Sequence, residues 1–257
     1  MSPRTKPWGR RGIPTTPTTG RRVIGLTALV LLLVGGLVFL VFWSAAFVVK
    51  DVKVAGVEGE VAESVERLAQ VPRGRPLARV SEGRVRERVQ EDLRVADLTV
   101  DSDWTDGTVT LRPTLREPAL VLRQGGTAWL SDVEGVVYDQ VDRPSRKLPS
   151  VTVSSKPTEL SGGTVRGLVE LWRTRPDPAK LEGDLSAPRL GANGLVTMKI
   201  EQLTIEWGAP AAAEKKWRVI EALIAQESID PQGDIPQTID VSLPDTPVVT
   251  GIPPAQG

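Results

Sequence analysis

The sequence predicts an α+β protein in which one apolar helix near the N-terminus precedes two folded units. The first observation is a run of 27 residues without charge, 23–49. The second is that short segments of alternating apolar and polar residues, typical of strands, are mixed with segments of helical periodicity from residue 48 onward. The third is the Glu117-Pro118 pair, beyond which the predicted strands become shorter and more numerous.

The residues before the apolar run form a basic tail, 1–22, with six positive charges and no acidic residue. Its prolines, threonines and glycines lack apolar periodicity, so we expect it to be disordered. The rest of the chain holds 26 basic and 32 acidic residues. This mildly acidic balance gives no reason to expect nucleic-acid binding.

The apolar run is long enough for a transmembrane helix, because about 20 residues cross the hydrocarbon core of a bilayer. We expect this single-pass helix at 23–47, with Trp43 at the membrane interface. A cleavable signal peptide ending at Ser44-Ala45-Ala46 is one alternative, although its apolar region would span only about 7–15 residues. A buried core helix is another, although such helices rarely stay uncharged for so long. The preceding positive charges predict a cytoplasmic N-terminus and an extracytoplasmic C-terminal body.

The first unit, 48–117, is predicted to follow the order strand, helix, helix, strand, strand. Its elements are a strand at 48–57, a helix at 61–69, a helix with Ser81 as N-cap, and strands at 95–104 and 108–115. Val85, Val89 and Leu93 share one face of the second helix, and we expect them in the core. A hairpin turn at 105–107 joins the last two strands. The two helices can then cover one face of a three-stranded sheet.

The second unit, 118–250, is predicted to be a mixed, mainly antiparallel sheet with two helices, ahead of a flexible end at 251–257. Its strands are expected at 119–123, 128–130, 136–138, 195–200, 203–207 and 237–243, and its helices at 164–173 and 212–227.

The composition excludes most hydrolase and metalloenzyme sites, because the chain has no cysteine and no histidine. Asp132 and Glu134 are the one carboxylate pair worth considering, and with Gly135 they fit a tight turn better than a metal site. We therefore expect no catalytic residue, no cofactor and no metal. Trp207-Gly208 could form a sugar-stacking platform, but Trp207 is expected to close a strand onto the core and Gly208 to take a conformation that other residues avoid. Lys215 and Lys216 are expected to lie at a solvated helix end, with a partner contact as the alternative.

The final strand of the second unit is the candidate functional site. Pro244 and Pro247 follow it closely, which favours an edge of the sheet over a central position. An edge carries unpaired backbone groups to which an extended partner can add a strand. The candidate partner-binding residues are Thr238, Ile239, Asp240, Val241, Ser242 and Leu243.

Seven short motifs in a fixed order resemble the FtsQ/DivIB family of bacterial division proteins over residues 21–250. They are VKDVKVAG (49–56) after the apolar run, VPRGRPL (71–77), EPA (117–119), WLSDVEGVVY (129–138), Leu148-Pro149, EWG (206–208) and IDVSLPDTPVV (239–249). The chain departs from some members at Ser242, Leu243 and Asp245, where those members carry aromatic residues.

The resemblance implies a POTRA domain at 48–117, followed by a β-rich domain, in a non-enzymatic scaffold of the septal peptidoglycan machinery. It also implies partners of the FtsB/DivIC and FtsL types, together with other septal membrane proteins, and it assigns FtsB/DivIC binding to the last strand and the preceding helix. A membrane-anchored glycan-binding module or envelope enzyme is the alternative. That alternative would need convergent carboxylates or two tryptophans sharing an exposed surface.

Overall fold

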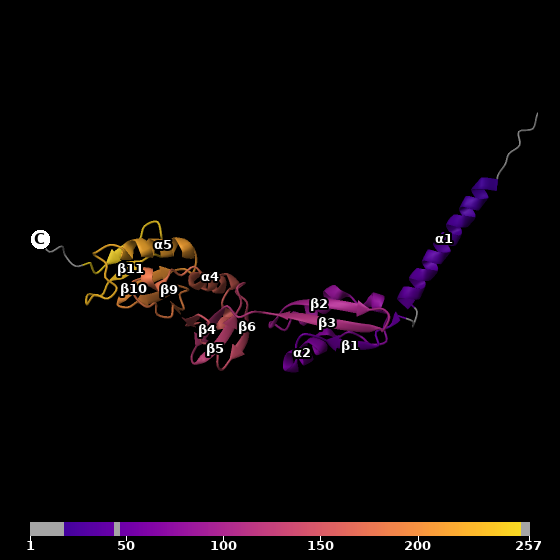
Figure 1. Cartoon of the computed structure of the whole chain (residues 1–257), viewed down its shortest axis with the longest axis horizontal. Coiled ribbons are helices and arrows are strands. Elements are labelled where there is room, and N and C mark those ends of the chain that lie inside the picture. Colours follow the sequence, from indigo (N-terminus) through magenta and orange to yellow (C-terminus); the bar gives the residue numbers. More distant parts are fainter. Residues whose placement is uncertain (1–17, 44–46, 253–257) are drawn as a thin grey trace, which may run out of the picture.

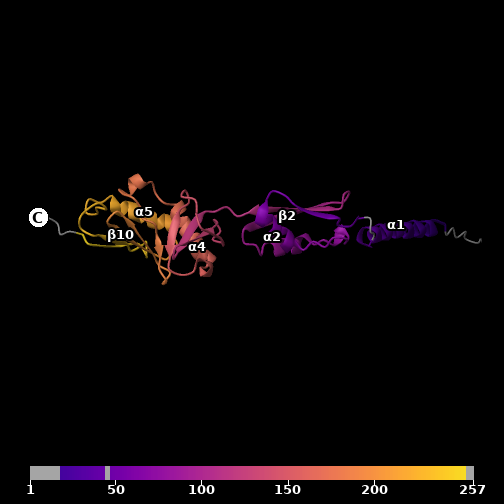
Figure 2. The same cartoon turned by 90° about the horizontal axis from the view of Figure 1, so that it is seen from below.

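The computed structural model describes residues 18–43 and 47–252. Most of the predicted basic tail (residues 1–17), the Ser44-Ala45-Ala46 segment and residues 253–257 of the predicted flexible end lie outside the described residues. Figures 1 and 2 show helix α1 (Thr18–Trp43), the first unit and the second unit following one another along the longest axis.

The large apolar side chains of α1 that the structure describes, at Ile24 and within 26–39, are all exposed. Counting only the residues that the structure describes, no helix has the length and apolar character needed to cross a membrane. The anchor at 23–47 therefore stays a prediction.

The first unit has the predicted order of elements. They are β1 (Asp51–Val54), α2 (Gly59–Ala69), the 3-10 turn η2 (Leu77–Arg79), α3 (Glu82–Val89), β2 (Val95–Asp103) and β3 (Thr108–Leu115). The strand order is β1-β3-β2, with β3 parallel to β1 and antiparallel to β2. Val65, Val85, Leu98 and Leu111 are among the buried residues that form one continuous core between the helices and the sheet.

Helix α3 ends earlier than predicted. Ser81 is the N-cap residue, although its side chain makes no capping hydrogen bond. Val85 and Val89 are buried as expected, but Leu93 lies beyond the helix end and is 49% exposed, so its predicted core position is wrong. The chain turns here because the Asp92 carboxylate accepts hydrogen bonds from the backbone N–H and the guanidinium of Arg94.

The second unit is a nine-stranded sheet with two α-helices. Its strands are β4 (Leu120–Gln124), β5 (Thr127–Ser131), β6 (Val137–Val141), β7 (Ser150–Val153), β8 (Arg189–Leu190), β9 (Val196–Ile200), β10 (Leu203–Gly208), β11 (Thr238–Asp240) and β12 (Val248–Thr250). Its helical elements are η3 (Pro157–Glu159), α4 (Gly162–Arg173), η4 (Pro178–Lys180) and α5 (Ala213–Ile224).

The order of the nine strands is β12-β11-β10-β9-β8-β7-β4-β5-β6. Antiparallel pairs outnumber parallel ones, as predicted, and the parallel pairs are β10–β11, β4–β7 and β7–β8. Helices α4 and α5 share one core with the sheet, and the Trp217 indole N–H of α5 donates to Leu171 O of α4 at 2.9 Å. Strands β7, β8 and β12 are absent from the sequence prediction.

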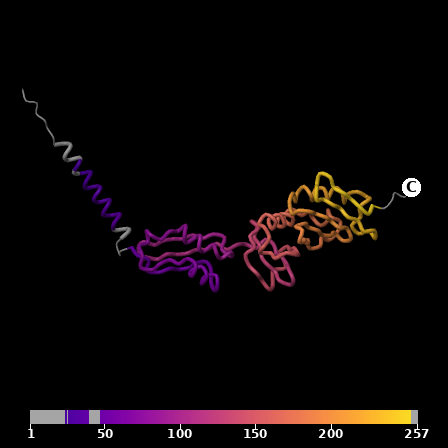
Figure 3. Tube along the Cα trace, turned by 180° about the vertical axis from the view of Figure 1, so that it is seen from behind, coloured from indigo at the N-terminus to yellow at the C-terminus, as the bar shows by residue number. Residues whose placement is uncertain are grey.

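One arginine links the two units. Figure 3 shows a single stretch of chain crossing between them, and Arg116 lies on it. The Arg116 Nε donates to Leu93 O of the first unit at 2.9 Å, and its Nη1 lies 2.5 Å from Asp132 Oδ2 in the second. Both side chains are largely buried, at 15% and 7% exposure.

Asp92 provides a pH-dependent contribution to the stability of the first unit. The hydrogen bond from Arg94 lowers the pKa of its carboxyl from 3.8 to about 2. A folded pKa below the unfolded value means that this stabilisation is complete above the unfolded pKa and is lost as pH falls from about 4 to about 2. We expect Asp92→Asn to lower the free energy of unfolding at pH 7 by about 1–2 kcal/mol, and to have little effect near pH 2.

Urea unfolding at the two pH values, followed by circular dichroism, measures the Asp92 effect. Asp97→Asn is the control, because Asp97 pairs with Arg86 on an exposed surface where ion pairs contribute little. Equal losses for the two variants at pH 7 would contradict the assignment to Asp92.

Removing the Arg116 side chain, which links the units, should lower the free energy of unfolding by more than removing an exposed ion pair. We expect Arg116→Ala to lower the free energy of unfolding by about 2 kcal/mol, because it leaves the buried Asp132 carboxylate without its cation. Arg112→Ala removes the exposed pair with Asp101 and should cost about 0.5 kcal/mol. Urea unfolding followed by tryptophan fluorescence compares them, and a change of similar size for both would show that Arg116 is dispensable.

Candidate partner-binding edge

The six predicted site residues do not lie on an edge. Thr238, Ile239 and Asp240 form β11, which pairs with β10 on one side and with β12 on the other. The prediction of an edge strand at 238–243 is therefore wrong. The cause is the segment after Pro247, where the chain adds β12 antiparallel to β11 after a turn in which Thr246 N–H donates to Leu243 O.

The same six residues divide into buried and accessible groups. Ile239 and Val241 are fully buried, and the Val241 N–H donates to Glu206 O at 2.9 Å. Thr238 and Asp240 are half-buried, whereas Ser242 and Leu243 are exposed, Leu243 by 70%. Of these side chains, Ser242 and Leu243 are the ones open to a partner.

Strand β12 is the edge of the nine-stranded sheet at the C-terminal end, and β6 is the edge at the other end. Val249 packs against the core, while Val248 and Thr250 are exposed. Three further exposed apolar side chains lie on the segments that flank β11 and β12: Ile235 before β11, Leu243 between the two strands and Ile252 after β12. Ile235, Leu243, Val248 and Ile252 are together called the β12 rim below.

Close contacts fix the segment between β11 and β12. Gly208 at the end of β10 has φ +76°, and a Cβ there would lie 2.6 Å from Ser242 Oγ. The Asp240 Oδ1 accepts from the Ser242 N–H at 2.7 Å, which turns the chain sharply after β11. On the far side of the loop, Lys215 Nζ of α5 lies 2.5 Å from Asp245 Oδ1.

Lys216 anchors α5 beside this edge. Its side chain is buried, and its Nζ donates to Trp207 O at 2.6 Å and to Ala209 O at 3.0 Å. Burial lowers the pKa of Lys216, and the charge of Asp240 opposes that change. The prediction of a solvated helix end is therefore wrong for Lys216, because Trp207 near the end of β10 and Ala209 just after it supply two carbonyl acceptors that the sequence does not reveal.

The other candidate sites have structural roles. Asp132 Oδ1 accepts from the Glu134 and Val136 N–H groups and so closes the predicted turn, while Oδ2 faces Arg116. Within residues 18–43 and 47–252, no group of acidic side chains could hold a metal ion.

The pair formed by Trp207 and Trp217 likewise serves the core. Trp207 and Trp217 lie 4.9 Å apart between ring centroids, but both are buried, so the pair offers no surface for stacking a sugar. Gly208 has the unusual conformation expected of it.

The strand formed by Val248, Val249 and Thr250 was not predicted from the sequence. They form a β-branched run after a proline. Such a run favours a strand, but three residues are too few to distinguish a strand from an irregular terminal segment. Their position beside β11 depends on long-range pairing, which the sequence pattern does not show.

Comparison with known proteins supports the resemblance. No protein-family profile matches the chain. The chain is 30% identical over 237 residues to the cell division protein FtsQ of Streptomyces venezuelae, covering 90% of this chain and 85% of that protein. It is also 30% identical over 209 residues to FtsQ of Streptomyces griseus, covering 79% and 96% of the two chains.

A more distant relative shows that the similarity extends beyond Streptomyces. FtsQ of Mycobacterium leprae is 27% identical over 216 residues, which are 83% of this chain and 59% of that protein. With 30% identity across nearly the whole of two curated FtsQ proteins, this chain belongs to the FtsQ family of cell division proteins.

Proposed function

We propose that this chain is a non-enzymatic, membrane-anchored scaffold of the bacterial divisome that holds a partner protein at the β12 edge. Its relatives are named cell division proteins. The observation that carries the proposal is the coincidence, at one end of the sheet, of a strand paired on one side only and the exposed apolar β12 rim.

The β12 edge has the chemistry that strand addition requires. An edge strand presents N–H and C=O groups that an extended segment can pair with, and flanking side chains supply apolar contact. The proposed occupant is an extended segment of an FtsB/DivIC-type partner, with an FtsL-type protein in the same assembly. Ser242 and Leu243 contribute side-chain contacts, whereas Ile239 and Val241 are buried in the core and are not open to the partner.

The anchor is supported by the exposed apolar side chains of α1. Leu26, Leu32 and Leu37 are each more than 60% exposed. A bilayer around 23–47 would bury them, and the basic residues ahead of it orient the N-terminus toward the cytoplasm. In this proposal the first unit is the POTRA domain, and both units lie outside the membrane at the division septum.

A charged side chain on the edge should block the partner. We expect Val248→Lys to weaken binding of an extracytoplasmic FtsB/DivIC-type fragment by about tenfold or more, which corresponds to about 1.4 kcal/mol. Because the Val248 side chain is exposed, its replacement should leave the core unchanged, whereas a substitution at the fully buried Val241 would disturb the core. Biolayer interferometry with the immobilised full chain gives the two dissociation constants.

Leu195→Lys is the matched control, because Leu195 is also an exposed apolar residue of the second unit but lies outside β12. Circular dichroism confirms that both variants are folded. Unchanged binding by Val248→Lys, or an equal loss in both variants, would contradict the β12 edge. Failure of the folded wild-type chain to bind the fragment would contradict the partner itself.

A further inference from the structure

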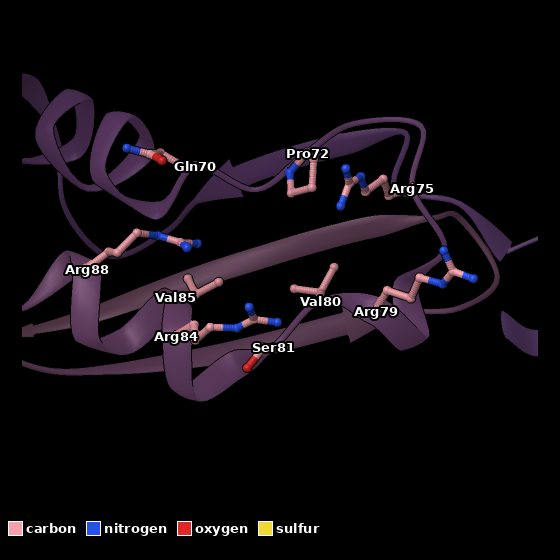
Figure 4. Close-up of a pocket in the computed structure, with 9 residues that line it drawn as sticks. All are labelled: Gln70, Pro72, Arg75, Arg79, Val80, Ser81, Arg84, Val85 and Arg88. Atoms are coloured by element: carbon pink, nitrogen blue, oxygen red, sulfur yellow. The ribbon is translucent and has the colours of Figure 1, made fainter.

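A cluster of arginines surrounds one pocket in the first unit. Figure 4 shows Arg84 and Arg88 on α3, Arg79 at the end of η2, and Arg75 on the preceding loop, all around the same opening. The pocket has a volume of about 300 Å³. Pro72, Val80 and Val85 give it an apolar side, and its nine lining residues include no acidic one.

Three of these arginines have no ion-pair partner among the described residues. None of the ion pairs in the first unit involves Arg75, Arg84 or Arg88. Those ion pairs join other arginines to acidic residues. The paired arginines of that unit are Arg73, Arg86, Arg94 and Arg112. Arg67, which lies outside the pocket, is also absent from these ion pairs, so the pocket is distinguished by the number of arginines at one opening and by the lack of an acidic residue there.

Arg88 is held in place by one of its donors and keeps another unused. Its Nη2 donates to Ala69 O at the end of α2, at 2.5 Å, which fixes the direction of the guanidinium. Its Nε is buried and has no hydrogen-bond partner. Leaving a buried donor of a charged group unpaired is unfavourable unless an acceptor fills the site.

The pocket lies on the side of the first unit that adjoins α1. The Val49 N–H, just after α1, donates to Arg75 O at 2.8 Å, and the Gly74 N–H donates to Val49 O at 2.7 Å. Val48 forms a bridge with Pro76, and η2 contacts α1 itself. The loop that carries Arg75 and Arg79 is thus pinned to the chain where it leaves α1.

We propose that the arginine pocket binds the phosphate group of an anionic lipid headgroup in the outer leaflet of the membrane. Guanidinium groups bind phosphate oxygens through paired, charge-assisted hydrogen bonds, and several converging guanidiniums favour a phosphate over a single carboxylate. The apolar side formed by Pro72, Val80 and Val85 suits the glycerol and upper acyl carbons. The inference rests on the proposed anchoring of α1, which brings the pocket close to the headgroups, and does not involve β12 or a protein partner.

Lipid retention by the full chain in a neutral detergent tests the proposal. Native mass spectrometry after addition of equal amounts of phosphatidylglycerol and phosphatidylcholine counts the molecules of each lipid that stay bound. We expect the wild type to prefer phosphatidylglycerol, and Arg75→Gln/Arg84→Gln to lose about fivefold or more of that preference. Arg67→Gln/Arg143→Gln, which removes the same charge from exposed positions outside the pocket, should retain it.

Each other outcome overturns part of the inference. Equal retention of both lipids by the wild type would exclude recognition of the anionic headgroup. An equal loss in both double variants would show general electrostatic attraction without a site. Displacement of phosphatidylglycerol by an equal concentration of inorganic phosphate would assign the pocket to a soluble anion. Since no protein partner is present, these results are independent of the β12 binding experiment.

Discussion

The arrangement of the two units depends on the ionic contact of Arg116. Each unit has its own buried core, and a single stretch of chain passes between them (Figure 3). Without a further contact that stretch would act as a hinge. Arg116 prevents this because one guanidinium bonds both Leu93 O, where α3 leads into β2, and Asp132, which closes the turn after β5. The carboxylate that looked like a candidate catalytic group is therefore the acceptor that fixes the joint.

A second buried cation, Lys216, shapes the far end of the molecule. By donating to one carbonyl near the end of β10 and one just after it, it holds α5 against the sheet. Ile239, Val241 and Val249 belong to the core at this end of the sheet. Among the described residues, no strand pairs with the outer side of β12. The two buried cations thus have different structural roles. Arg116 sets the orientation of the second unit, and Lys216 supports its outermost strand.

Local sequence patterns predicted much of this structure, but they could not predict which strands pair over long distances in the sequence. The order of elements in the first unit followed from periodicity, and Gly208 and the Asp132 turn followed from backbone preferences. Leu93 was misplaced because helical spacing continues past the point where Asp92 and Arg94 end α3. The site was placed on β11 because two prolines suggested the end of the sheet, yet three residues after them suffice for β12. The burial of Lys216 could not be predicted either, because its two acceptors, Trp207 O and Ala209 O, lie outside its own helix.

The breadth of the second sheet has a consequence for the reach of a partner. Neighbouring strands lie about 4.8 Å apart, so the nine strands place β12 about 40 Å from β6. Figure 1 shows the second unit extending away from α1, with its C-terminal end the most distant part. In the proposed orientation the sheet acts as a spacer that holds its binding edge far above the bilayer. A partner anchored in the same membrane would need a rigid stalk to cover that height, and an α-helix rising 1.5 Å per residue would need about 27 residues for 40 Å alone.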